Sequence, residues 1–355
     1  MRKHLLVFLA LSLTLTACAA EATPLPTNTP VPFTETPTQT STPEPTATFT
    51  LTSTPTPVPN PMSIIALRNM DYPGSEISIV KELERGINYR RYYVYYLSEG
   101  LKIYALLTVP NGEPPEGGFP AIVFNHGYIP PDVYKTTERY IAYVDQIARA
   151  GYVVFRIDYR GHDQSEGEAR NAYGDPGYQI DVMNAVASIK QYPSVNPEKI
   201  GMWGHSMGGY LTLRAMVISQ DIKVGVIWAG VVASYPDLVY NWRRTGSFTP
   251  SPSSRGAGWR TSWIEQYGTP EENPAFWDSV SATSYLTDLS GPLELHHGTA
   301  DEDVPIEFSI RLAELARQQG KIANLYTYDG DNHNISKYFT TAMNRTIEFF
   351  DIYLK

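Results

Sequence analysis

The chain has 355 residues and a mass of 39.7 kDa, a length that fits either two ordinary domains or one large α/β domain. Its formal net charge is −9, and removing the two basic and three acidic residues before Met62 leaves 26 basic against 34 acidic residues. Because this acidic chain has no basic stripe, the sequence argues against nucleic acid as its main partner.

The first 18 residues follow the order of a bacterial export signal. Arg2 and Lys3 precede an apolar stretch, residues 5–15, that is too short to span a bilayer as a helix. Residues 15–18, LTAC, resemble the lipobox of bacterial lipoproteins, where lipid is attached to the new amino-terminal cysteine. We therefore expect a lipoprotein signal over 1–18 and a lipid on Cys18 that anchors the protein to a membrane outside the cytoplasm. The alternative is an ordinary secretory signal with an incidental cysteine.

Residues 19–61 are predicted to be a disordered linker. Between Ala22 and Pro61, 25 of the 40 residues are proline or threonine, which cannot build an apolar core. As polyproline II at about 3.1 Å per residue, this segment would reach roughly 130 Å. Residues 62–355 hold nearly all the aromatic side chains and are long enough to bury one large core. Because Cys18 is the only cysteine, this domain has neither disulfides nor a thiol nucleophile.

The domain begins with strand patterns and continues with strands that alternate with helices. Residues 77–84, 92–97 and 101–109 predict an antiparallel lead-in. Residues 121–124 are continuously apolar, as in a strand buried on both faces of a parallel sheet. The pattern then predicts strands at 152–157, 199–203, 224–228, 292–296 and 323–328, and helices at 140–150, 178–189, 207–218, 306–317 and 338–354. This alternation predicts an α/β fold with a mostly parallel central sheet and helices on both faces.

A candidate nucleophile lies between a predicted strand and a predicted helix. Residues 204–208, GHSMG, match the G-x-S-x-G pattern, whose glycines permit a sharp turn that exposes the Ser206 hydroxyl. The helix that starts after Ser206 points its free N–H groups and positive dipole end at this position, where an oxyanion would form. The alternative is a glycine-rich turn with an incidental serine.

A serine nucleophile needs a base, and the base needs an orienting acid. In this strand–turn–helix context the acid and then the histidine follow the serine in the chain. Only His333 fits the base, because the other six histidines leave with the signal, precede Ser206 or precede any well-placed acid: His4, His126, His162, His205, His296 and His297. Asp301 lies just beyond a predicted strand and is the expected acid, with Asp303 left open as the alternative.

The oxyanion hole is expected to use two backbone amides, those of Met207 and Tyr128. Tyr128 belongs to residues 125–128, NHGY, which follow a predicted strand and supply the needed glycine. In this segment His126 is interpreted as a structural hydrogen-bonding residue. A metal site made of His126, Asp158 and His162 is conceivable, but no ligand spacing supports it, and we expect neither a metal nor a cofactor.

Residues from about 92 to 355 resemble an α/β-hydrolase of the prolyl-oligopeptidase and dipeptidyl-peptidase type. The resemblance rests on the serine motif and on residues 297–305, HGTADEDVP, which match that family's His-Gly-x-x-Asp-x-x-Val-Pro run. It implies Ser206 as nucleophile, Asp301 as orienting acid and His333 as base, with a small peptide or ester as substrate. The large peptidases carry a β-propeller that filters substrates, whereas only about 60 residues lie between Pro61 and Ala121, too few for a propeller.

Residues 231–291 interrupt the alternation and are expected to form a cap above the nucleophile. They hold four of the six tryptophans and several other rings: Trp242, Trp259, Trp263, Trp277, Tyr235, Tyr240, Phe248, Tyr267, Phe276 and Tyr285. These rings could line a substrate pocket or simply form core, and Arg243 and Arg244 could bind a carboxylate or face water. The sequence thus predicts a lipid-anchored, extracytoplasmic serine peptidase; a carboxylesterase with the same residues and a non-catalytic binding protein are the alternatives.

Overall fold

The computed structural model describes residues 59–242 and 258–355. The chain divides into two units, Met1–Thr56 and Pro57–Lys355, and the described residues all belong to the second. The predicted signal, the predicted lipidation site Cys18 and the linker up to residue 58 therefore lie outside the described residues, as do Arg243, Arg244 and Phe248. Within the described part of the chain, no helix has the length and apolar character that a membrane span requires.

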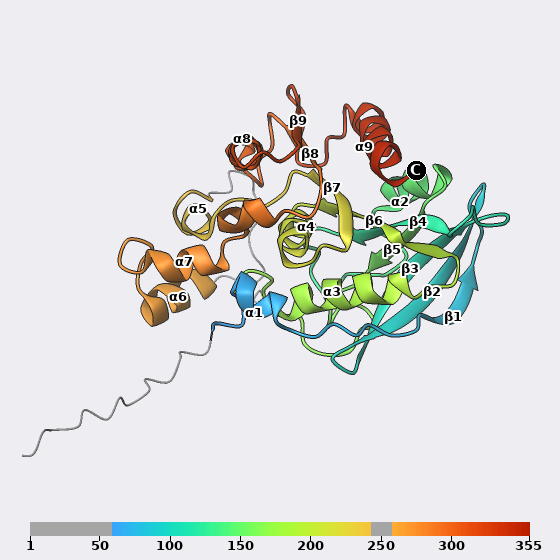
Figure 1. Cartoon of the computed structure of the whole chain (residues 1–355), viewed down its shortest axis with the longest axis horizontal. Coiled ribbons are helices and arrows are strands. Elements are labelled where there is room, and N and C mark those ends of the chain that lie inside the picture. The colour runs from blue at the N-terminus through green and yellow to red at the C-terminus, as the bar shows by residue number, and fades with distance from the viewer. Residues whose placement is uncertain (1–58, 243–257) are drawn as a thin grey trace, which may run out of the picture. The chain divides into compact units, whose positions relative to one another are not determined.

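A nine-stranded sheet with the order β1-β2-β3-β5-β4-β6-β7-β8-β9 forms the centre of the domain (Figure 1). The antiparallel lead-in is confirmed: neighbours pair antiparallel from β1 through β3 to β5. All later neighbours pair parallel. The strands are β1 (Ser78–Leu83), β2 (Tyr89–Ser98), β3 (Leu101–Pro110), β4 (Phe119–Asn125), β5 (Val153–Ile157), β6 (Val195–His205), β7 (Ile222–Trp228), β8 (Leu293–Gly298) and β9 (Ala323–Tyr328).

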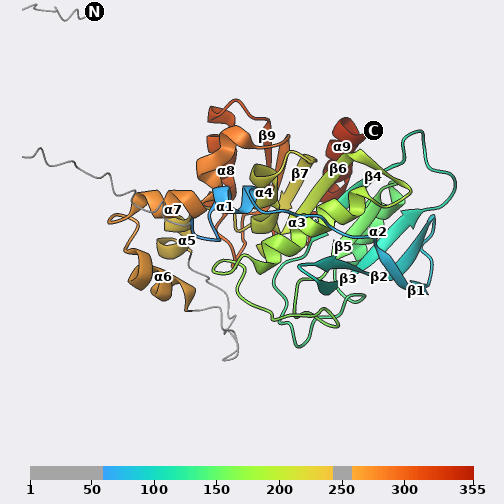
Figure 2. The ribbon, with the colours of Figure 1, turned by 60° about the horizontal axis from the view of Figure 1, so that its bottom comes forward.

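Helices cover both faces of this sheet (Figures 1 and 2). Every residue of β4 and β5 is buried, as the continuous apolar runs predict for strands covered on both sides. One apolar cluster joins the sheet to α1 (Ile64–Arg68), α3 (Gly177–Lys190), α4 (Met207–Ile218) and α8 (Ile306–Gln318). A second cluster joins the opposite face to α2 (Ile141–Arg149) and α9 (Phe339–Leu354). The α/β-hydrolase arrangement expected from the sequence is thus the observed one.

Between β7 and β8, where the sequence predicts a cap, the described residues form four short helical segments. They are α5 (Tyr235–Tyr240), α6 (Trp259–Tyr267), α7 (Pro274–Val280) and the 3₁₀ segment η1 (Ala282–Asp288). Trp242, Trp259, Trp263 and Trp277 are at most 8% exposed, and the ring of Trp263 stacks on Tyr235 with centroids 5.2 Å apart. These tryptophans therefore form the core of the cap, one of the two alternatives that the sequence left open.

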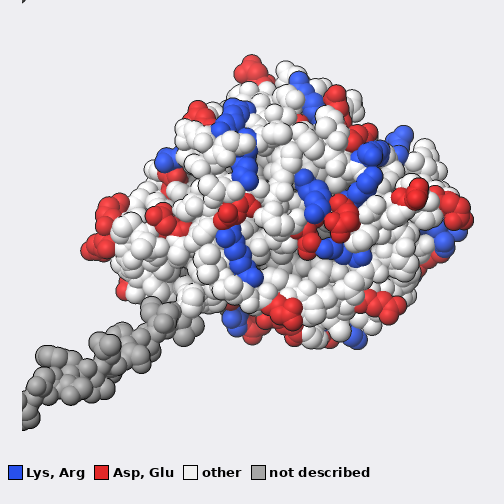
Figure 3. Space-filling model, in the orientation of Figure 1, with Lys and Arg blue, Asp and Glu red and all other residues white. Residues whose placement is uncertain are grey.

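Acidic and basic side chains are interspersed on the face of the molecule that Figure 3 shows. No continuous basic stripe runs across the described residues visible there. This distribution agrees with the excess of acidic residues in the sequence and offers no electrostatic track for a nucleic acid on that face.

Candidate active site

Ser206 occupies the turn between β6, which ends at His205, and α4, which begins at Met207. Its backbone has φ 56° and ψ −117°, a strained conformation for a residue with a side chain. The flanking glycines allow this turn, because a Cβ on Gly204 would collide with the carbonyl of Gly208, and a Cβ on Gly208 with the carbonyl of Asn125. The close backbone packing presents Ser206 at the carboxyl end of the parallel strands.

Asp301 and His333 come from the loops that follow β8 and β9 and meet beside this turn. His333 Nδ1 lies 2.8 Å from Asp301 Oδ2. The other carboxylate oxygen, Oδ1, accepts the backbone N–H groups of Asp303 at 2.9 Å and Val304 at 3.0 Å. The structure therefore joins His333 to Asp301, and Asp303 contributes its backbone amide to the carboxylate.

A second histidine holds the same carboxylate. His297 Nε2 lies 3.1 Å from Asp301 Oδ2, and His297 Nδ1 lies 2.8 Å from Ser309 Oγ. Burial raises the pKa of the Asp301 carboxyl, but the hydrogen bonds from His297 and His333 outweigh burial and hold that pKa well below its usual range. Asp301 is therefore ionised at neutral pH and can stabilise a positive charge on the His333 ring.

His205, the residue before Ser206 in the chain, contacts His333. The ring centroids of His205 and His333 are 4.6 Å apart, and His205 Nε2 lies 3.0 Å from the His333 carbonyl oxygen. No hydrogen bond joins Ser206 Oγ to the His333 ring among the described residues. Nucleophile–base contacts of this kind commonly tighten only in the substrate complex.

The loop after β4 packs directly against the serine. A Cβ on Gly127 would lie 3.2 Å from Ser206 Cβ, so only glycine fits at this position without a shift. Tyr128 follows Gly127, and Met207 is the first residue of α4, whose N–H has no partner within the helix. The two expected oxyanion donors thus lie on the two segments that border Ser206.

His126 has the structural role that the sequence suggested. Its Nδ1 lies 2.6 Å from the carbonyl oxygen of Gly127, which can only accept, so Nδ1 carries the proton. Burial lowers the pKa of His126 well below its ordinary value and keeps the ring neutral. The conceivable metal set of His126, Asp158 and His162 does not form: among the described residues, only Asp301, Asp303 and His333 bring three ligand atoms within 4.8 Å of one another. Both oxygens of Asp301 are already engaged by N–H donors, so this group has the arrangement of a carboxylate that orients an imidazole.

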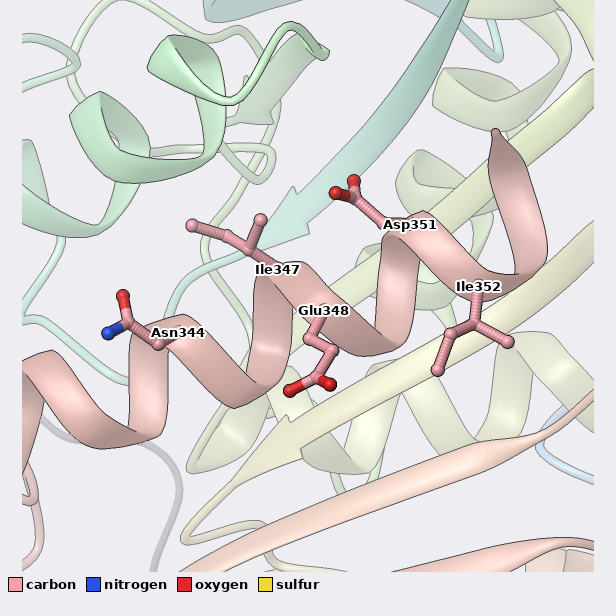
Figure 4. A pocket seen from close by; sticks show the side chains of 5 residues that line it. All are labelled: Asn344, Ile347, Glu348, Asp351 and Ile352. Carbon is pink, nitrogen blue, oxygen red and sulfur yellow. The ribbon is translucent and has the colours of Figure 1, made fainter.

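The two described pockets lie away from these residues. One, of about 550 Å³, is a shallow depression on α9 lined by Asn344, Ile347, Glu348, Asp351 and Ile352 (Figure 4). The other, of about 690 Å³, lies between α5, η1 and α8 and reaches the site loop only at Pro305. Aromatic side chains connect α4 and the loop after β8 to the cap. Tyr210, in the first turns of α4, places its hydroxyl 2.6 Å from that of Tyr235, and Trp242 donates its indole N–H to the Asp303 carbonyl at 2.9 Å.

Comparison with known proteins places this geometry in a family. The model of the prolyl oligopeptidase family matches residues 139–355, which contain every residue of the site except the loop after β4. The chain belongs to the prolyl oligopeptidase family. As a member of this family it is a serine hydrolase, and the resemblance seen in residues 204–208 and 297–305 is confirmed.

Relatives and solved structures include both peptidases and esterases. The uncharacterized peptidase YtmA of Bacillus subtilis (strain 168) is 28% identical over 259 residues, which are 73% of this chain and 90% of YtmA. An acetyl xylan esterase from Paenibacillus sp. R4 superposes with a TM-score of 0.59 at 18% identity, over 80% of this chain and 91% of that one. The acylaminoacyl peptidase of Pyrococcus horikoshii superposes with a TM-score of 0.58 at 22% identity, over 76% of this chain and 42% of that one. The chain also matches the uncharacterized peptidase YuxL of Bacillus subtilis (strain 168), of which it spans 35%.

Three residues of the site were missed in the sequence. His297 was considered only as a base and rejected, yet it donates to Asp301 from within the His-Gly-x-x-Asp run. His205 occupies the variable position of the serine motif, and its position next to Ser206 is the sequence feature that points to a role in the site. Tyr140 is predicted as the first residue of a helix, but it is the N-cap of α2 with φ 57°, and no sequence signal marks its contact with His205.

Proposed function

We propose that this prolyl-oligopeptidase-family hydrolase cleaves peptide bonds with Ser206, His333 and Asp301. In this mechanism Ser206 Oγ attacks the carbonyl carbon while His333 Nε2 takes its proton. Asp301 stabilises the resulting imidazolium, and the amides of Met207 and Tyr128 stabilise the oxyanion. His333 then protonates the leaving amine, and the same base activates the water that hydrolyses the acyl-enzyme.

The observation that carries this proposal is the 2.8 Å contact between His333 Nδ1 and Asp301 Oδ2 beside the strained Ser206 turn. The contact fixes the ring so that Nε2 is the nitrogen available to the serine. The lowered pKa of Asp301 supports the role of a permanent counter-charge.

We expect a small peptide or ester as substrate, without the size filter that a β-propeller gives the large peptidases of this family. The described residues that precede β4, residues 59–118, form α1 and the strands β1 to β3, and they contain no propeller. Tyr210, Tyr235 and Trp242 are at most 8% exposed, so these rings support the cap and do not line an open substrate pocket.

A carboxylesterase is the second candidate, because the same residues can cleave an ester. The acetyl xylan esterase from Paenibacillus sp. R4 favours it, since 91% of that chain is matched without a further domain. Matched substrates with one acyl group, a p-nitroanilide and a p-nitrophenyl ester, separate the two candidates. Amide turnover well above that of the Ser206→Ala variant supports the peptidase, and ester turnover alone supports the esterase.

We also propose that the enzyme works outside the cytoplasm on a lipid anchor at Cys18. The support is the sequence of the first 18 residues, with two basic residues, an apolar run and a lipobox-like LTAC. Fractionation of cells that express the full chain tests this proposal. The wild type is expected in the membrane fraction with a mass increase on the peptide that contains Cys18, and Cys18→Ser in the soluble fraction. A wild-type protein without lipid in the soluble fraction would contradict it.

A further inference from the structure

One chain of hydrogen bonds joins four separate segments of the site through the side chains of Tyr140 and His205. The Gly127 N–H donates to Tyr140 Oη at 2.9 Å, and Tyr140 Oη lies 2.7 Å from His205 Nδ1. On the other side of the ring, His205 Nε2 lies 3.0 Å from the carbonyl oxygen of His333, an ordinary hydrogen-bond distance. The chain thus runs from the loop after β4, through the N-cap of α2 and the residue before the nucleophile, to the backbone of the base.

The direction of each proton in this chain is fixed by its two ends. The His333 carbonyl can only accept, so His205 Nε2 carries a hydrogen. Burial, reinforced by the nearby His333, lowers the pKa of His205 to about 3, so the ring is neutral and its Nδ1 is an acceptor. Tyr140 therefore donates its only hydrogen to Nδ1, and its lone pair accepts the Gly127 N–H. Burial raises the pKa of Tyr140, which keeps this hydroxyl protonated.

The same contacts restrict the two groups that the reaction must hold still. His333 is fixed at its carbonyl by His205 and at its ring by Asp301, which leaves Nε2 for the serine. Gly127 packs closely against both side chains of the hydrogen-bond chain, because a Cβ there would lie 2.8 Å from Tyr140 Oη and 3.1 Å from His205 Nδ1. The next amide after Gly127 is that of Tyr128, the proposed oxyanion donor.

We propose that Tyr140 and His205 are a positioning pair that holds the base and the oxyanion loop around Ser206. This inference rests on the proposed function, since it assigns roles relative to the Ser206 nucleophile and the His333 base. The pair touches no reacting atom and acts through His333 and Gly127. Its effect is on the orientation of the catalytic groups, so it changes the rate of the chemical step and the binding of transition-state analogues more than the binding of substrate.

Tyr140→Phe in the full chain tests the first half of the pair. The ring packs edge-on against Phe124 and Trp203 and remains in the variant, so only the hydroxyl is lost. We expect kcat to fall about 10- to 100-fold with KM changed by less than about twofold. The affinity for a trifluoromethyl ketone analogue should fall by a similar factor. Tyr89→Phe is the matched control, because it removes a hydroxyl that bonds Asp145 of the same helix α2 away from the site.

Two substitutions of His205 separate its two hydrogen bonds. Glutamine can place an amide N–H near the position of Nε2 and keep the bond to His333, whereas asparagine can keep only an acceptor near the position of Nδ1. We expect His205→Gln to retain at least about fivefold more kcat than His205→Asn, the factor that corresponds to one hydrogen bond of about 1 kcal/mol. Rates are divided by the folded fraction from the near-ultraviolet circular dichroism of each variant.

The outcomes distinguish this inference from the proposed function. If Ser206→Ala keeps its activity, the proposed function is wrong. If Ser206→Ala is inactive but Tyr140→Phe matches Tyr89→Phe in kcat and in analogue affinity after correction for folding, the positioning pair is wrong and the proposed function stands. Equal kcat for the two His205 variants would also contradict the role assigned to the bond between His205 and His333.

Discussion

Replacing Asp301 by asparagine should reduce the rate far more than replacing Asp303, although the two carboxylates are two residues apart. Asp301 accepts four N–H donors, from His297, His333 and two backbone amides. An amide side chain can offer only one acceptor oxygen, so in either orientation two of these donors would face an NH₂ group. In either orientation the His333 ring would lose the negative charge that stabilises its protonated form, and in one of them it would lose its hydrogen-bond partner as well.

The magnitude follows from the 2.8 Å contact between the ring and the carboxylate. Unit charges at this separation attract by about 6 kcal/mol at an effective dielectric constant of about 20. At about 1.4 kcal/mol per factor of ten, a loss of this size lowers kcat by about 10⁴-fold. Asp303→Asn removes no hydrogen bond of the site and should keep kcat within about twofold of the wild type.

Steady-state hydrolysis of a p-nitrophenyl ester, corrected for the folded fraction, measures both variants. We expect the loss in Asp301→Asn to lie in kcat, because the imidazolium charge develops only in the transition state. If Asp303→Asn loses more activity than Asp301→Asn, the acid has been assigned to the wrong residue. If both keep full activity, the hydrogen bond to His333 has no part in the reaction.

Two further predictions concern the packing and the charge around the site. Gly127→Ala should lower kcat at least about tenfold and destabilise the fold by about 1 to 3 kcal/mol, because its Cβ would lie 2.8 Å from Tyr140 Oη and 3.2 Å from Ser206 Cβ. Gly258→Ala is the control, because a Cβ there meets no described atom within 4 Å. Equal effects of the two substitutions in urea unfolding and ester hydrolysis would contradict the close packing. Burial raises the pKa of Asp158 to about 7. A carboxyl with a raised folded-state pKa contributes stability that is fully present below about pH 4 and is lost as the pH rises through 7. The free energy of unfolding of the wild type should therefore fall by up to about 4 kcal/mol relative to that of Asp158→Asn between pH 4 and pH 8. Unfolding free energies of the two proteins that run parallel over this range would contradict that prediction.

The fold was largely predictable because its strands and helices carry strong patterns. The continuous apolar runs of β4 and β5 have no polar face, and they are buried on both sides as predicted. The strand predicted at 199–203 is shorter than β6, which starts at Val195. The polar residues and the proline at 196–198 lack a strand pattern and hid this start. It also missed α1, a five-residue helix that begins after the capping Ser63. Short helices of this kind depend on tertiary packing more than on their own pattern.

The candidate site was predictable where local sequence defines the geometry. The serine motif between a strand and a helix predicts a sharp turn, and Ser206 has the positive φ of such a turn. Chain order then left few candidates for the acid and the base. The sequence favoured Asp301 as the acid but left Asp303 open, because both lie in one loop and the fold decides which carboxylate meets His333. The link from Tyr140 to His205 spans 65 positions in the chain and leaves no periodic trace in the sequence.

The central claim is that Ser206 is the nucleophile, and a fluorophosphonate that reacts covalently with activated serines tests it most directly. After labelling of the full chain, peptide mass analysis is predicted to find one adduct, on Ser206. Ser206→Ala is predicted to remain unlabelled and folded, with kcat reduced by about 10⁴-fold or more. An adduct on another residue, or labelling of the Ser206→Ala variant at the wild-type rate, would contradict the account.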